Sequence, residues 1–332
     1  METGLHKRIL WAVIIIIVAI FPQVADIYYT NVFVGFAIFA LYSVALNLLL
    51  GYSGLLSFGF AMFFGIGAYS TALALTHIEG FPLLPAVLIG GVVPALVAFV
   101  LSPLLVRVSG TAFAMITLAF GQLTFVVALK WREVTGGEDG IGGYPIPPLN
   151  ILGVLSIDMT NPTNFYYFAV VVIGLCLWLV WFFTKTPFGS IMIGIRDNAG
   201  RIDYMGFRLA HSKMVILVVS GGFAGIAGAF YALFQNLVST VGVLDAFTSF
   251  VPLMMVYIGG VASFVGPIIG SAIVHIVEDI AVRHTDRVDL VNGVIFILVV
   301  LYAPMGVVGL FRAAKANWFT RSVSQASTEK TS

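Results

Sequence analysis

Few side chains in this sequence have the type and spacing needed for acid–base chemistry, and the clearest group is His275, Glu278 and Asp279. His275 and Asp279 are four residues apart, which places them on one face of a helix, and Arg283 follows Asp279 at the same interval. Such a group could relay protons inside a membrane. Because these residues lie near the end of an apolar segment, we favour ion pairing at the membrane surface. An enzyme built on them is the weaker alternative.

The motifs that carry nucleotide, metal or acyl-transfer chemistry are missing from the chain. It has no Gly-x-x-x-x-Gly-Lys-[Ser/Thr] phosphate loop, no His-Glu-x-x-His and no Gly-x-Ser-x-Gly. Its one cysteine, Cys176, excludes an intrachain disulfide framework and a cysteine zinc cluster. We therefore predict no catalytic residue, no metal site and no cofactor bound by this chain itself.

Neutral polar side chains are spread through the apolar segments instead. They can hydrogen-bond a neutral or zwitterionic solute without the cost of burying a net charge, although each one taken singly is better explained as a bridge between helices. The predicted substrate-pathway residues are Asn47, Ser53, Ser57, Thr117 and Gln122, and Ser220, Gln235 and Asn236 are of the same kind.

The elements that must position these residues are membrane helices. Hydrophobic residues make up 60% of the 332 residues and charged residues 9%, whereas a soluble domain has roughly 25% charged residues. The net charge of +1 gives no indication of a nucleic-acid partner. We predict an all-α polytopic membrane protein with about ten transmembrane or re-entrant helices, since about 20 apolar residues cross the hydrocarbon core. The predicted spans are 9–25, 32–50, 55–75, 82–106, 111–130, 164–184, 213–236, 247–265, 267–282 and 289–311.

Basic residues set the predicted orientation. Lys and Arg occur before the first span, in the loop 185–213 and after residue 311, so the positive-inside rule makes these regions cytoplasmic. Ten crossings likewise place both termini in the cytoplasm, and the loop 131–163 then faces the periplasm. Residues 1–311 form the predicted transmembrane domain, and the Ser/Thr-rich segment 312–332 is predicted to be a disordered cytoplasmic tail.

Glycine and proline interrupt the apolar pattern in two separated places, 51–67 and 259–270. Short interrupted segments of this kind indicate broken helices whose freed backbone groups line a path. Single glycines are better explained by close contact between helices. For 51–67 as a whole we predict a broken or re-entrant helix. The glycine-rich loop 136–143 lacks the residues of a phosphate or calcium site, so we predict a glycine turn that touches a partner or the substrate entrance.

The loop 185–213 has the composition of a docking element. Asp197 or Asn198 can cap the start of a short helix, and Gly206 can supply its left-handed end. Apolar and charged side chains between them form a mixed surface suited to another protein, although a connecting helix lying on the membrane is the alternative. The predicted docking residues are Arg196, Asp197, Asn198, Arg201, Asp203, Tyr204, Met205 and Gly206.

An ordered set of segments resembles LivM-type permeases, the membrane subunits of branched-chain (hydrophobic) amino acid ABC importers. The longest matching segment is 45–69, which contains Gly-Tyr-Ser-Gly-Leu-Leu-Ser-Phe-Gly. The chain departs from the family at 190–193 and at Met305, where basic residues are usual. The other matching segments are 135–141, 186–189, 195–198, 205–206, 220–231, 259–260, 266–267 and 302–306.

The resemblance implies a permease in the bacterial inner membrane that pairs with a second, homologous permease. It implies two cytoplasmic ATPase subunits, which bind ATP and Mg, and a periplasmic substrate-binding protein. In such families the loop that matches 189–206 is the coupling helix, held in a groove of the ATPase. Relatives that carry urea, short amides or aromatic acids leave the solute open. The rival hypothesis is a stand-alone channel or secondary carrier for a small neutral solute.

Overall fold

The computed structural model describes residues 18, 20–151, 155–261, 263–285, 287–302 and 306–309. Most of them are helical, as an apolar chain in lipid requires, because a helix satisfies its own backbone hydrogen bonds. The predicted span 9–25 lies largely outside these residues, as does the predicted tail 312–332. Within the described residues, eight segments are long and apolar enough to cross a membrane. They are Ile27–Tyr52, Leu83–Leu105, Thr111–Lys130, Pro162–Lys185, Leu209–Gln235, Thr240–Gly259, Val265–Val282 and Leu290–Gly309.

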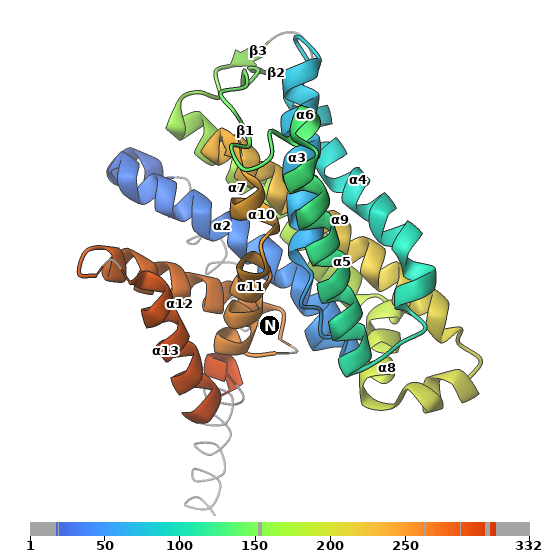
Figure 1. Cartoon of the computed structure of the whole chain (residues 1–332). Coiled ribbons are helices and arrows are strands. Elements are labelled where there is room, and N and C mark those ends of the chain that lie inside the picture. Colours follow the sequence, from blue (N-terminus) through green and yellow to red (C-terminus); the bar gives the residue numbers. More distant parts are fainter. Residues whose placement is uncertain are drawn as a thin grey trace, which may run out of the picture.

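The predicted all-α membrane fold is confirmed, and short connections join most of the helices (Figure 1). The helices are α2 (Ile27–Asn47), its π-helical continuation η1 (Leu48–Tyr52), α3 (Ala61–His77), α4 (Leu83–Leu105), α5 (Thr111–Lys130), α6 (Arg132–Thr135), α7 (Pro162–Lys185), α8 (Pro187–Tyr204), α9 (Leu209–Gln235), α10 (Thr240–Leu244), α11 (Ala246–Gly259), α12 (Val265–Val282) and α13 (Val288–Tyr302). Two small antiparallel ladders pair β1 (Ile141–Gly142) with β4 (Leu237–Val238) and β2 (Leu149–Ile151) with β3 (Leu155–Ile157).

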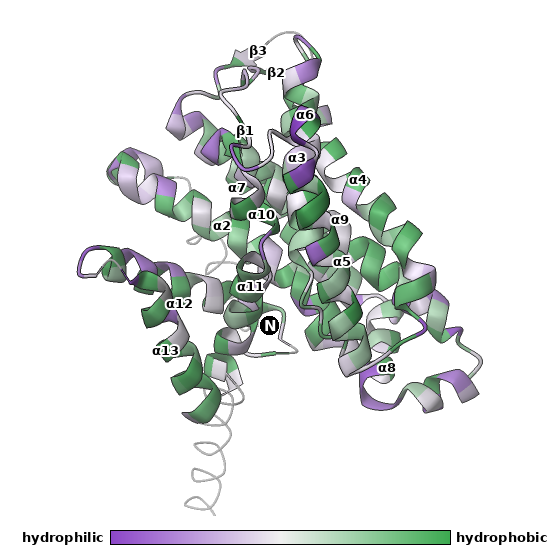
Figure 2. Cartoon of the chain, in the orientation of Figure 1, coloured by the Kyte–Doolittle hydropathy of each residue, from purple (hydrophilic) through white to green (hydrophobic). Residues whose placement is uncertain are grey.

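Small residues hold α3, α4 and α9 together at the centre of the bundle. A Cβ atom added to Gly67 of α3 would lie 2.2 Å from the carbonyl oxygen of Gly225 in α9. One added to Gly225 would lie 2.3 Å from the carbonyl oxygen of Gly90 in α4. The backbones of these helices touch, which is how membrane helices gain van der Waals contact without a hydrophobic driving force. Figure 2 shows apolar residues along most of the bundle helices, whereas α8 is mixed.

The predicted break within 51–67 is confirmed. The helix α2 ends in the π-helix η1, residues 54–60 are irregular, and α3 begins at Ala61 rather than at residue 55. Close contact with α5 explains the late start, because a Cβ atom on Gly59 would lie 1.8 Å from the carbonyl oxygen of Thr117. A second interruption separates α11, which ends at Gly259 rather than at residue 265, from α12.

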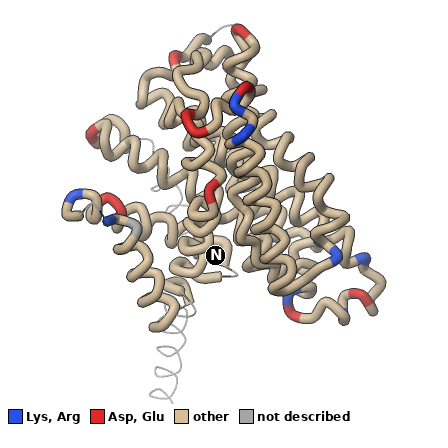
Figure 3. The backbone as a smooth tube through the Cα atoms, viewed as in Figure 1, with Lys and Arg blue, Asp and Glu red and all other residues tan. Residues whose placement is uncertain are grey.

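The two longest polar segments lie at opposite ends of the bundle. The segment that carries α6, β2 and β3 is at the top of Figure 1, and α8 is at the lower right. We call these the loop end and the α8 end. Figure 3 shows charged residues at the ends of the helices, with the middle of the bundle nearly free of them. This distribution is the one that a bilayer imposes, since a charge at its centre is costly.

Candidate functional site

The two interruptions in the helices are joined by Asn47, the last residue of α2. Its Nδ2 atom donates a hydrogen bond to the carbonyl oxygen of Ser263, which lies between α11 and α12, at 3.0 Å. The Oδ1 atom of Asn47 and the Oγ atom of Ser57 are buried and have no hydrogen-bond partner among the described residues. Buried polar atoms are nearly always paired with protein or water. Each of these two atoms is therefore able to bind a water molecule or a polar group of a solute.

The other predicted pathway residues make local hydrogen bonds. The hydroxyl of Ser53 donates to the carbonyl oxygen of Leu49 at 2.7 Å, and that of Thr117 donates to Ala114 at 2.9 Å. The backbone of Thr117 lies against Gly59, so α5 forms one side of the interruption. Gln122 is half-buried in α5.

A residue that sequence reasoning did not select supports the start of α3. The Oγ atom of Ser249 in α11 accepts a hydrogen bond from the backbone N–H of Ala61 at 2.8 Å. It satisfies one of the free donors at the first turn of a helix, in the manner of an N-cap residue, although it is distant in sequence. A serine within an apolar helix is the signal that could have identified it.

The helix α8 is bent at Asn198, whose backbone is non-helical with φ −161° and ψ 94°. The Oδ1 atom of Asn198 accepts a hydrogen bond from the backbone N–H of Arg201 at 3.0 Å, so Asn198 caps the short helix that follows. Gly206, with φ +88°, ends that helix in the left-handed conformation. The cap at Asn198 and the left-handed end at Gly206 are confirmed. We call residues 199–206 the α8 tip.

The α8 tip folds back and leaves large side chains in solvent. Ile202 is buried against Gly194, where an added Cβ atom would lie 2.5 Å from its Cδ1 atom. Tyr204 is 95% exposed and Met205 is 65% exposed. An exposed aromatic and an exposed methionine beyond the end of the bundle form the type of surface that other proteins contact.

Arg196 points away from the α8 tip and toward the bundle. Its Nη1 atom donates a hydrogen bond to the carbonyl oxygen of Gly51 in η1 at 2.7 Å, and its Nη2 atom pairs with Asp197 at 3.0 Å. Its Cγ atom lies against Gly54. The last carbonyl groups of a helix lack intrahelical partners and favour a nearby cation. Arg196 therefore connects α8 to the end of the broken helix, a connection that the sequence spacing does not reveal.

At the loop end, the glycine turn predicted for 136–143 is confirmed, because the glycines at 136, 137, 140 and 143 all have positive φ. The turn lies on the bundle and does not extend freely. The hydroxyl of Thr240 donates to the carbonyl oxygen of Gly137 at 2.6 Å and is 3.0 Å from the hydroxyl of Tyr69. The Tyr144 hydroxyl donates to the carbonyl oxygen of Ala232 at 2.5 Å, and burial raises the pKa of Tyr144, so it remains a donor.

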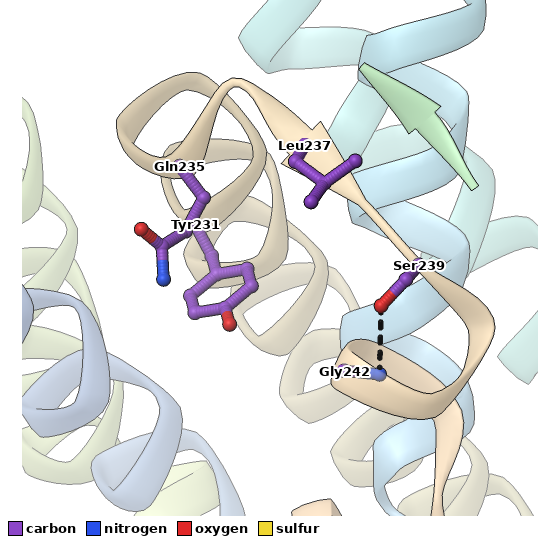
Figure 4. Close-up of a pocket in the computed structure, with 5 residues that line it drawn as sticks. All are labelled: Tyr231, Gln235, Leu237, Ser239 and Gly242. Carbon is purple, nitrogen blue, oxygen red and sulfur yellow. Dashed lines mark hydrogen bonds between the residues drawn. The ribbon is translucent and has the colours of Figure 1, made fainter. Parts of the chain in front are cut away.

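Below this turn is a pocket of about 180 Å³ between the end of α9 and α10 (Figure 4). Its five lining residues are Tyr231, Gln235, Leu237, Ser239 and Gly242. Sequence reasoning had singled out Gln235 but not the others: Tyr231 lies one turn earlier on α9, and Leu237, Ser239 and Gly242 come from the short strand β4 and from α10, which only the fold brings beside α9.

The predicted ion pairing at His275, Glu278 and Asp279 is confirmed in part by bonds that tie α12 to its neighbours. Asp279 accepts hydrogen bonds from Arg283 at 3.0 Å and from the Tyr28 hydroxyl in α2. Glu278 accepts one from Asn292 in α13 at 3.0 Å. In the described part of the chain, no group of three His, Cys, Asp or Glu side chains could hold a metal ion.

The chain is similar in sequence to known transport permeases. The model of a family described as the permease component of branched-chain amino acid transport systems matches residues 28–303. The high-affinity branched-chain amino acid transport permease LivM of Salmonella typhimurium is 26% identical over 94% of this chain and 77% of its own length. LivM of Escherichia coli is 27% identical over 83% of this chain and 68% of its own length. The probable branched-chain amino acid transport permease LivH of Methanocaldococcus jannaschii is 23% identical over 74% of this chain and 80% of its own length. No solved structure matches the chain.

Proposed function

Because the chain belongs to the family of permease components of branched-chain amino acid transport systems, we propose that it moves branched-chain or related amino acids from periplasm to cytoplasm as one subunit of an ATP-driven importer. The protein is a multi-pass membrane protein, in agreement with the eight segments of its described residues that are long and apolar enough to cross a membrane. The proposal places it in a bacterial inner membrane with the α8 end in the cytoplasm. The basic residues near that end support this orientation.

The observation that carries the proposal is the connection from the α8 tip through Arg196 to η1. An ATPase that binds the α8 tip would contact its exposed side chains, which are Arg201, Asp203, Tyr204 and Met205. Movement of α8 would then displace the carbonyl of Gly51, which Arg196 holds. Because the segment after η1 contacts α5, and Asn47 just before η1 is bonded to the α11–α12 turn, that displacement would reach several helices at once.

The partners in this proposal follow from what the chain itself contains. The chain has no phosphate loop of its own, and the family resemblance implies two partner ATPase subunits, which would bind ATP and Mg. The similarity to LivH as well as to LivM supports a second, homologous permease beside this one. A periplasmic binding protein would deliver the solute at the loop end.

The experiment is a pull-down of the tagged chain from its native membrane in mild detergent, followed by reconstitution of the recovered complex into lipid vesicles. We expect a second permease and ATPase subunits to co-purify. Uptake of L-leucine should require ATP on the side of the vesicle membrane where the ATPase subunits are bound. Uptake of urea, a short amide and an aromatic acid is measured beside it to define the solute. Recovery of the chain alone, with passage of L-leucine in the absence of ATP, would show a channel or carrier.

A further inference from the structure

The pocket beside α10 combines neutral polar groups with an apolar surface. Tyr231 and Gln235 are one helical turn apart on α9 and point to the same side (Figure 4). Ser239 and Leu237 face them from the segment that follows α9. None of the five lining residues carries a charge, and the volume of about 180 Å³ is below that of a pocket for a drug-sized ligand. The pocket therefore suits a small solute with one polar end and one apolar side.

The polar groups of the pocket leave donors and acceptors for such a solute. The Oγ atom of Ser239 accepts a hydrogen bond from the Gly242 backbone N–H at 3.1 Å, so its own O–H proton is left to donate. The amide of Gln235 can both donate and accept, which lets it bind a carboxylate or an ammonium group. The ring of Tyr231 is fixed by contacts with Phe39 and Phe64, with centroid distances of 6.2 and 5.4 Å.

The glycine turn at the loop end holds the far wall of this pocket in place. The ladder pairs Ile141 with Val238 and Gly142 with Leu237, directly before Ser239. The hydrogen bond from Thr240 to Gly137 secures the same segment on its other side. A Cβ atom on Gly140 would lie 2.3 Å from the carbonyl oxygen of Val238, so the turn and the wall are in backbone contact. The turn therefore has a structural purpose that its sequence alone left open.

From these contacts we infer that the pocket between α9 and α10 binds the zwitterionic amino acid during its passage from the loop end into the bundle. The inference rests on the proposed function and adds a site to it. The carboxylate and ammonium groups of the solute pair with Gln235, Ser239 and Tyr231, and the apolar side chain lies along Leu237. An amino acid with a net charge is excluded because no lining residue can neutralise it.

Site-directed labelling tests the inference, since the chain contains one cysteine, the buried Cys176. In a Cys176→Ala background, Gln235→Cys in the reconstituted complex is treated with a membrane-impermeant maleimide, with and without L-leucine. We expect L-leucine at a concentration that saturates uptake to slow labelling at least about fivefold, and L-lysine to leave the rate unchanged. The matched control is Gln23→Cys, which replaces an exposed glutamine outside the pocket and whose labelling L-leucine should not alter.

A kinetic measurement covers the case in which the cysteine variant fails to assemble. Gln235→Leu keeps the size of the side chain and removes its hydrogen bonds, and we expect the KM for L-leucine to rise about tenfold, the equivalent of one lost hydrogen bond. If labelling and the KM are both unchanged in a complex that takes up L-leucine with ATP, the pocket does not bind the amino acid, and the proposed importer function is unaffected. A wild-type complex that takes up no amino acid would overturn both.

Discussion

The two ends of the bundle are attached to it in different ways. At the loop end, Thr240 of α10 donates a hydrogen bond to Gly137 of the glycine turn and is itself paired with Tyr69 of α3, and Tyr144, directly after the turn, donates to Ala232 of α9. At the α8 end, the side chain of Arg196 donates a hydrogen bond to the carbonyl oxygen of Gly51 in η1, and α8 also packs beside α7 and α9. The loop end is held by bonds from buried groups and forms a fixed rim, whereas the hydrogen bond from α8 to η1 comes from a partly exposed side chain.

This difference has a physical basis in the groups that make each attachment. Buried hydrogen bonds between backbone and hydroxyl groups are costly to open, because each would leave an unsatisfied polar atom. An arginine that is 32% exposed can exchange its carbonyl partner for water at much smaller cost. Both properties suit the proposed function, in which the solute site keeps its shape while the helix that contacts the ATPase moves.

Substitution at Gly140 should produce the largest effect, because it strains the fixed rim directly. Gly140 has φ +73°, and an added Cβ atom would lie 2.3 Å from a backbone oxygen. We expect Gly140→Ala to lower the free energy of unfolding by at least about 3 kcal/mol, from left-handed strain plus the clash. The measurement is the midpoint of thermal unfolding of the purified complex.

The matched control for that substitution is Gly143→Ala. Gly143 has φ +68°, and no atom lies within 4 Å of the position of an added Cβ. It should cost only the backbone strain, about 1–2 kcal/mol. Equal losses for the two variants would show that the contact with Val238 is not what makes the rim rigid.

Substitutions at the α8 end should separate binding of the ATPase from transmission of its movement. Arg196→Ala should leave ATPase subunits attached but reduce L-leucine uptake per ATP hydrolysed about tenfold, because the connection to Gly51 is lost. Tyr204→Ser should instead reduce the amount of ATPase recovered with the complex, since it removes an exposed aromatic contact. Co-purification and the ratio of uptake to hydrolysis are measured on both. Loss of ATPase in the Arg196 variant would assign that residue to docking.

Gly206→Ala should have the smallest effect of the series. Gly206 has φ +88° and open space around it, so alanine introduces local strain of about 1–2 kcal/mol without a clash. Because the strain falls at the end of the α8 tip, it should weaken recovery of the ATPase a few-fold and leave the unfolding midpoint of the complex nearly unchanged. Gly80→Ala, at φ +71° in equally open space beyond α3, is the control and should leave ATPase recovery unchanged. A shift of the unfolding midpoint as large as that of Gly143→Ala would show that the tip is part of the rigid bundle.

Local features of the fold were predictable because their causes lie within a few residues. Membrane helices follow from runs of apolar side chains, the cap at Asn198 from its short polar side chain, and the left-handed end at Gly206 from its missing Cβ. The start of α3 was placed too early, because the apolar pattern continues through 55–60 while contact with α5 interrupts the helix there. The pattern of apolar residues does not predict which neighbouring helix packs against them.

The sequence by itself determined the class of the protein, most of its described spans and the position of its interruptions, because hydrophobicity and backbone freedom are properties of each residue. The tertiary structure alone decided which distant groups meet: Arg196 with Gly51, Asn47 with Ser263, and Gln235 with the wall at Ser239. Those contacts depend on how whole helices pack, and in a chain with so many small residues close approach is possible at many places. Only the packing of the whole bundle decides at which of these places the helices make contact.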